Sequence, residues 1–127
     1  MKYGYTKGVS GEFSDVLERT RKALTQEGFG ILTEIDVRAT LKKKLNVDYA
    51  AYVILGACNP PFAYQALQSE KEIGLLLPCN VIVYEKKEGV FVSAILPTVA
   101  MSVVGNALLT PIVQEVEKKL KKMVDLL

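Results

Sequence analysis

A charged turn between two apolar runs constrains the fold of this chain more than any other feature of its sequence. Residues 75–84 (LLLPCNVIVY) are mostly apolar, residues 85–89 (EKKEG) are charged and end in glycine, and residues 90–96 (VFVSAIL) alternate between two sides. Alternation with period two is typical of a strand. We therefore predict a β-hairpin over residues 75–96, which favours a largely antiparallel sheet.

Pro78 interrupts the first run of this hairpin. Proline has no N–H to donate to a neighbouring strand, so it is found at sheet edges, bulges and bends rather than inside a ladder. We expect one of these irregularities at Pro78.

Strand-like and helix-like stretches alternate along the rest of the chain. Period-two or continuous apolar patterns predict strands, and apolar residues at helical spacing predict helices. Strands are expected at 3–9, 30–37 and 49–57, and helices at 13–27, 38–47, 60–67 and 111–127. The short helix over 38–47 is expected to lie on the core with its lysines in solvent. This order predicts an α+β fold with helices on one face of a mainly antiparallel sheet.

Length and composition are those of one globular domain. The chain has 127 residues, 50% hydrophobic and 24% charged, so residues 1–127 are predicted to fold as a single domain with its own core. The formal net charge of +2 is too small to indicate a nucleic-acid partner. The first residues lack the apolar stretch of a signal peptide, and no apolar run is long enough to span a membrane. We expect a cytoplasmic protein with reduced thiols, no nucleic-acid partner and no membrane contact.

The absence of histidine limits the available chemistry. It excludes a Ser-His-Asp triad, a Cys-His pair and an imidazole metal ligand. A general base would have to be a perturbed Glu, Asp, Lys or Cys side chain. The sequence therefore favours a binding protein over an enzyme, leaves catalysis open, and indicates no cofactor.

The two cysteines of the chain each precede an asparagine, as Cys58-Asn59 and Cys79-Asn80. One interpretation is that both are small buried residues, because free cysteine is among the most buried residue types. Another is a reactive thiol pair, which requires the two Cα atoms to lie within about 7 Å. Cys58 is the better candidate nucleophile, since a predicted helix start follows it and a helix N-terminus favours a thiolate. Two cysteines supply only half a zinc shell, so we expect no metal within one chain, although a dimer could complete such a site.

Asn59 and Asn80 are polar residues in apolar surroundings. Asparagine followed by two prolines is typical of a helix N-cap, and Asn80 is expected to bond backbone groups at the Pro78 bend. Alternatively, both amides and the N–H groups near residues 61–63 line a small pocket for an anion or a carbonyl group.

Glu34 and Asp36 are predicted to share one strand face, about 7 Å apart. Paired carboxylates of this kind act as an acid and a base or hold a metal, unless the face is simply solvated. Cys58 is the one candidate catalytic residue. The candidate ligand-binding residues are Cys58, Asn59, Cys79, Asn80 and Glu34.

Four stretches together resemble one family over nearly the whole chain: GFGILTEIDV (28–37), LKKKL (41–45), YVILGACNP (52–60) with a following Ala63, and IGLLLPCNVIVYE (73–85). They resemble the domain-of-unknown-function family 302, a set of small prokaryotic proteins. The resemblance implies a β-α-β4-α arrangement similar to the TATA-box-binding-protein-like class, with a curved antiparallel sheet, but no DNA binding and no established activity. Members often have Asp-Pro where this chain has Leu96-Pro97, so any role of that aspartate is in doubt here.

These observations predict a small cytosolic ligand-binding or sensing module that acts as a homodimer. Its partner would be a small molecule or an anion at the two Cys-Asn dipeptides. The alternatives are a thiol-based redox protein or enzyme that uses Cys58, and a protein-interaction module that uses the apolar, small-residue-rich segment 98–109.

Overall fold

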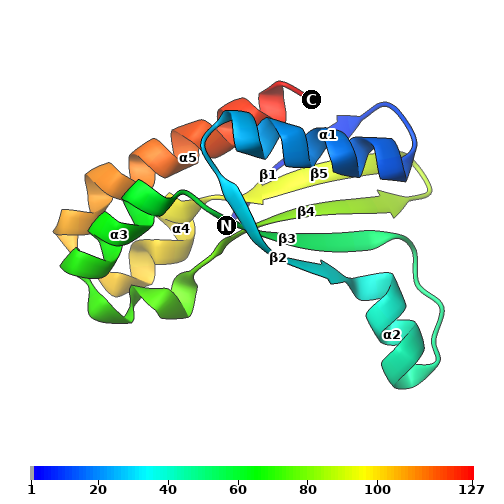
Figure 1. Cartoon of the computed structure of the whole chain (residues 1–127), viewed down its shortest axis with the longest axis horizontal. Coiled ribbons are helices and arrows are strands. Elements are labelled where there is room, and N and C mark those ends of the chain that lie inside the picture. The colour runs from blue at the N-terminus through cyan, green and yellow to red at the C-terminus, as the bar shows by residue number, and fades with distance from the viewer. Residues whose placement is uncertain (1) are drawn as a thin grey trace.

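The computed structural model describes residues 2–127, which form a five-stranded antiparallel sheet with its helices (Figure 1). The strands, in the sheet order β1-β5-β4-β3-β2, are β1 (Gly4–Val9), β2 (Gly30–Asp36), β3 (Tyr52–Cys58), β4 (Cys79–Lys86) and β5 (Gly89–Ile95). The α-helices are α1 (Phe13–Gln26), α2 (Val37–Leu45), α3 (Pro60–Ser69), α4 (Pro97–Ala100) and α5 (Thr110–Asp125). Three short 3-10 helices are η1 (Lys71–Leu76), η2 (Met101–Val104) and η3 (Ala107–Leu109). With α2, α3 and α4 as insertions, the order is the expected β-α-β4-α, and the α+β fold is confirmed.

The predicted hairpin is confirmed as β4 and β5, which pair antiparallel down to Lys86 opposite Gly89. The turn is shorter than expected, because only Lys87 and Glu88 lie outside the strands. The start of the hairpin was predicted wrongly, since residues 75–76 belong to η1 and not to a strand. Pairing begins only at Cys79, directly after Pro78, which has no N–H for a ladder and follows a cis peptide bond.

Helices α1 and α5 lie side by side over one face of the sheet (Figure 1). Their apolar residues recur at helical spacing and are buried against the strands. The sheet presents every second residue of β3, β4 and β5 to them, so that one face is buried and the other is only half-buried. The centre of this core consists of Leu24, Leu55, Val81, Val83, Val92, Leu120 and Met123.

A second hydrophobic cluster lies beside this core, where α3, η1, η2, η3 and the start of α5 meet. Its buried members are Ala66, Ile73, Met101, Leu109 and Val113. Polar contacts hold these short elements in place. The Asn106 amide donates to the Ser69 carbonyl oxygen at 2.9 Å, and the backbone N–H and hydroxyl of Thr98 both donate to Oε1 of Glu117, at 3.0 and 2.7 Å. Segment 98–109 is therefore packed within its own chain at Met101 and Leu109.

Helix α2 departs from the prediction that it lies on the core. None of its residues is buried, and Leu45 is 66% exposed. Figure 1 shows α2 projecting from the end of β2, away from α1 and α5. Leu41 and Leu45 are four residues apart as expected, but Leu41 is only half-buried and Leu45 is exposed, so neither side chain is part of the core. β2 itself is an exposed edge strand with an irregularity at Leu32, which has no register partner in β3.

None of the helices in the described part of the chain is long and apolar enough to cross a membrane.

Two leucines near the end of the chain test this arrangement of the core. Leu120 on α5 is 1% exposed, whereas Leu126, just after α5, is 59% exposed. We expect Leu120→Ala to lower the free energy of unfolding by about 2–5 kcal/mol, because it leaves a cavity between α5 and the sheet. Leu126→Ala is expected to change it by no more than about 0.5 kcal/mol. Urea unfolding followed by circular dichroism measures both, and equal losses would contradict this packing.

Candidate functional site

A pocket of about 270 Å³ lies between the two hydrophobic clusters. The main core contributes Phe29, Ala57 and Val116 to its walls, and the second cluster contributes Ala66, Met101 and Val113. Cys58, Asn59 and Cys79 also line it, so the structure brings three of the five sequence-predicted residues together.

The pocket exists because β3 and β4 separate at this end of the sheet. Their pairing stops at Ala57 opposite Cys79. Beyond it, Pro60 opens α3 and Pro78 precedes β4, and neither proline can donate to a ladder. Gly56 permits the close approach of Pro78, because a Cβ at Gly56 would lie 2.8 Å from Cγ of that proline. The chain on both sides therefore leaves the sheet and contributes to the second cluster. The pocket lies in the seam between the two clusters.

The two cysteines are free thiols of different character. Cys79 is buried, and burial raises the pKa of its thiol from the ordinary 9.0 to about 11, with a further contribution from the charge that nearby Cys58 would carry. Cys79 is therefore a neutral thiol at physiological pH and a weak nucleophile. Cys58 is half-buried and pairs with Gly30, whereas Cys79 pairs with Ala57.

Asn59 carries the one amide side chain among the residues that line this pocket. It stands at the predicted N-cap position of α3, but its side chain makes no capping hydrogen bond. One reason is that Pro61, at the second helical position, has no N–H to be capped. Asn59 is only 9% exposed, and no hydrogen bond within residues 2–127 engages its amide. Its polar atoms are not sealed from solvent either. Nδ2 lies by the turn at Gly28, where an added Cβ would come within 3.3 Å of it, and Asn59 as a residue lines the pocket.

Asn80 lies at a neighbouring hollow of about 220 Å³ and not in this pocket. The two hollows share the residues that separate them: Leu77, Pro78, Cys79, Pro97 and Met101. The two Cys-Asn dipeptides therefore place their cysteines at one pocket and their asparagines at two different ones.

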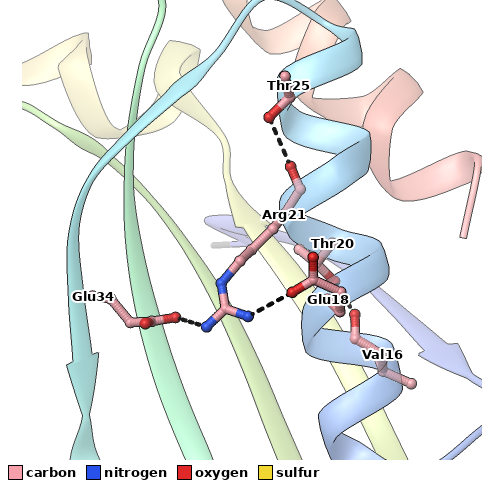
Figure 2. A network of polar contacts seen from close by, with 6 residues as sticks. All are labelled: Val16, Glu18, Thr20, Arg21, Thr25 and Glu34. Atoms are coloured by element: carbon pink, nitrogen blue, oxygen red, sulfur yellow. Dashed lines mark hydrogen bonds and ion pairs between the residues drawn. The ribbon is translucent and has the colours of Figure 1, made fainter.

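Glu34 is placed away from the pocket and has a partner of its own. Figure 2 shows its carboxylate bonded to Arg21 of α1, which also reaches Glu18 at 3.0 Å. Asp36 accepts a hydrogen bond of 2.9 Å from the backbone N–H of Ala39 and so caps α2. Both carboxylates thus have structural contacts, and the pocket does not include them.

The electrostatic character of the pocket is neutral. No charged side chain among residues 2–127 lines it. The helix start at Asn59 is a poor anion site as well, because only Phe62 of the first three helical residues carries a backbone N–H. Within the described chain, no three His, Cys, Asp or Glu side chains gather where they could hold a metal ion.

The sequence did not point to the far wall of the pocket, formed by Met101, Val113 and Val116. The small-residue-rich segment 98–109 was a signal for Met101, but the helical stripe of α5 does not reveal which members face a cavity. Leu96 takes the N-cap position of α4, where its side chain makes no cap and an aspartate would be able to.

Residues 5–127 match the family described as Domain of unknown function DUF302, and the chain belongs to that family. It is similar to a solved structure described as "Crystal structure of uncharacterized conserved protein DUF302 from Bacillus stearothermophilus". The identity is 31%, the TM-score is 0.92 and the match covers 98% of each chain. A comparison with curated proteins found no match. The resemblance inferred from the sequence is confirmed.

The raised pKa of Cys79 predicts a pH-dependent loss of stability. Between pH 9.0 and about 11 the unfolded thiol releases its proton while the folded one keeps it, so the free energy of unfolding falls as pH rises. We expect Cys79 to account for about 2–3 kcal/mol of this fall. Urea unfolding of reduced wild type and of Cys79→Ala across this range measures the difference, which isolates Cys79 from the tyrosines and lysines. Parallel pH profiles would contradict the burial of a neutral thiol.

Proposed function

We propose that this DUF302 protein is a cytosolic binding or sensing module that takes a small, neutral, largely apolar molecule into the pocket at the cluster seam. The observation that carries the proposal is Asn59, a residue only 9% exposed that lines an apolar pocket and whose amide has no hydrogen bond within residues 2–127. The polar atoms of this amide are open to solvent, so water can bond to them in the empty pocket. A ligand with one hydroxyl, carbonyl or N–H group would replace that bond while its apolar part fills the pocket.

The ligand is expected to be neutral rather than an anion. A charge in this pocket would lose its hydration and find no cation, and such a transfer is strongly unfavourable. The amide of Asn59 has both a donor and an acceptor, so it can bond to either a carbonyl oxygen or a hydroxyl or N–H group of the ligand. The anion considered from the sequence is therefore the weaker candidate.

The size of the pocket narrows the ligand class further. About 270 Å³ lies just below the range of roughly 300–1,000 Å³ that is typical of small-molecule sites. A molecule of one or two rings, or a short branched chain, with a single polar group fits this volume. Binding without chemistry agrees with a lining whose polar side chains are Asn59 and two thiols.

Thiol chemistry at Cys58 is a second candidate, because Cys58 is only partly buried and lines the same pocket. It predicts that Cys58 reacts with iodoacetamide much faster than a free thiol does. Alkylation followed by peptide mass spectrometry tests it, and a rate at or below that of a free thiol removes this candidate.

The main proposal is tested with three probes of one shape: naphthalen-2-ylmethanol, 2-methylnaphthalene and 2-naphthoate. At neutral pH we expect the alcohol to raise the melting temperature most and the carboxylate to have no effect, since only the alcohol combines neutrality with a hydrogen bond to Asn59. Asn59→Leu should weaken binding of the alcohol by about fivefold, corresponding to about 1 kcal/mol, and leave binding of the hydrocarbon nearly unchanged. Binding of the carboxylate alone would contradict the proposal.

A matched pair of filling variants locates the site. Ala63 is half-buried and lines the pocket, whereas Ala107 is exposed and lies outside it. Ala63→Phe should abolish binding of the neutral probes, and Ala107→Phe should preserve it. If Ala63→Phe binds them as wild type does, the probes occupy another place and the proposal fails.

A further inference from the structure

Strand β2 contains one residue more than its ladder with β3 needs. Ile31 pairs with Ala57 and Thr33 pairs with Gly56, so Leu32 has no partner although its two neighbours pair with consecutive residues of β3. An extra residue of this kind is a β-bulge, which bends the strand and redirects a side chain. Bulges are frequent beside active sites, where the redirected side chain has a use.

Pairing within the sheet gives no reason for this bulge. Ile31 packs against the main core, on the same face as its partner Ala57. Thr33 lies with Gly56 on the outer face of the sheet, which α1 and α5 do not cover, and a Cβ on that glycine would meet the Thr33 hydroxyl. Ile31 and Thr33 therefore alternate as neighbours in a regular strand do, and the ladder would continue unbroken without Leu32.

The extra residue lies at the opening of the pocket between the two clusters. Leu32 lines this pocket and is 64% exposed. Leu67 of α3, at 40% exposed, is the other exposed residue of the lining, and every other lining residue is buried or half-buried. Two leucines from separate elements thus form an apolar rim around the opening, and we refer to Leu32 and Leu67 together as the rim.

The rim is apolar surface that the protein itself does not cover. Neither leucine belongs to a hydrophobic cluster, and apolar surface gains free energy in proportion to the area that leaves water. Two side chains give far less area than a protein partner buries, so the rim suits a small molecule. It is continuous with a pocket that has no charged side chain in its described lining. A molecule that fills the pocket and extends through the opening therefore covers the rim with its own apolar part.

We propose that the bulge in β2 positions Leu32 to contact an apolar tail of the ligand, so that the protein selects neutral amphiphiles longer than its pocket. This inference rests on the proposed function and deepens it. Asn59 bonds the polar group, the pocket takes the body of the molecule, and the rim covers its tail. A compact ligand leaves the rim in water, whereas one with a tail removes it from water. The ligand class is thus a neutral molecule with one polar group and an apolar tail, such as an alkylaryl alcohol.

Two probes with the same polar group test this selection: naphthalen-2-ylmethanol and (6-butylnaphthalen-2-yl)methanol. The chain has no tryptophan, so the fluorescence of the naphthalene ring measures binding without an indole background. We expect wild type to bind the butyl probe about tenfold more tightly than the parent, because part of the butyl chain leaves water at the rim. Leu32→Ala should reduce this ratio to about threefold or less, and should change the Kd of the parent by less than about twofold.

Leu45→Ala is the matched control. Leu45 is 66% exposed, close to the exposure of Leu32, and it lies outside the pocket. The two substitutions therefore remove the same atoms from equally exposed positions, and circular dichroism should be unchanged in both variants. Leu45→Ala should keep the wild-type ratio between the two probes.

The other outcomes overturn the inference. If wild type binds the parent but gains nothing from the butyl chain, the rim does not contact the ligand, although the proposed function stands. An unchanged ratio in Leu32→Ala, or an equal fall in Leu45→Ala, shows that the tail does not lie on Leu32. Binding of neither probe by wild type overturns the proposed function together with this inference.

Discussion

The end of backbone pairing between β3 and β4 is the constraint on which the rest of this structure depends. The ladder stops at Ala57 opposite Cys79, because Pro60 and Pro78 flank that pair and neither can extend it. Had the strands continued, α3 and η1 would have no room beside the sheet. The break divides the apolar residues into two clusters, and the seam between them is the pocket.

The two prolines after Asn59 explain why its side chain makes no helix cap. A proline at the first helical position sets the backbone for α3, and a second proline at position 61 removes one of the N–H groups that an asparagine cap would use. The amide therefore makes no cap, and Asn59 lines the pocket with its side chain unpaired within residues 2–127. Cys79, a neutral thiol in the same wall, keeps the pocket uncharged.

Local patterns were enough to predict the β4–β5 hairpin, the strands, α1, α5 and their antiparallel arrangement. They failed where tertiary context decides. The apolar run ending at Leu77 fits a strand or a 3-10 helix equally well, and only the packing of the second cluster selects the helix. Leu41 and Leu45 have the spacing of a core-facing helix, but spacing does not say whether a surface is there to receive it. The N-cap position of Asn59 was predicted correctly, while its missing hydrogen bond follows from geometry. The pocket wall from α5 lies too far along the chain for any local signal.

Methyl NMR of the protein with naphthalen-2-ylmethanol shows whether the seam between the two clusters binds a ligand, because each wall of the pocket carries a methyl reporter. We expect chemical-shift changes and intermolecular contacts at Leu77, Met101, Val113 and Val116, which line the seam, and none at Ile82 on the outer sheet face. Changes confined to Ile82, or no saturable change at the seam, would contradict the claim that the break between β3 and β4 builds a ligand site.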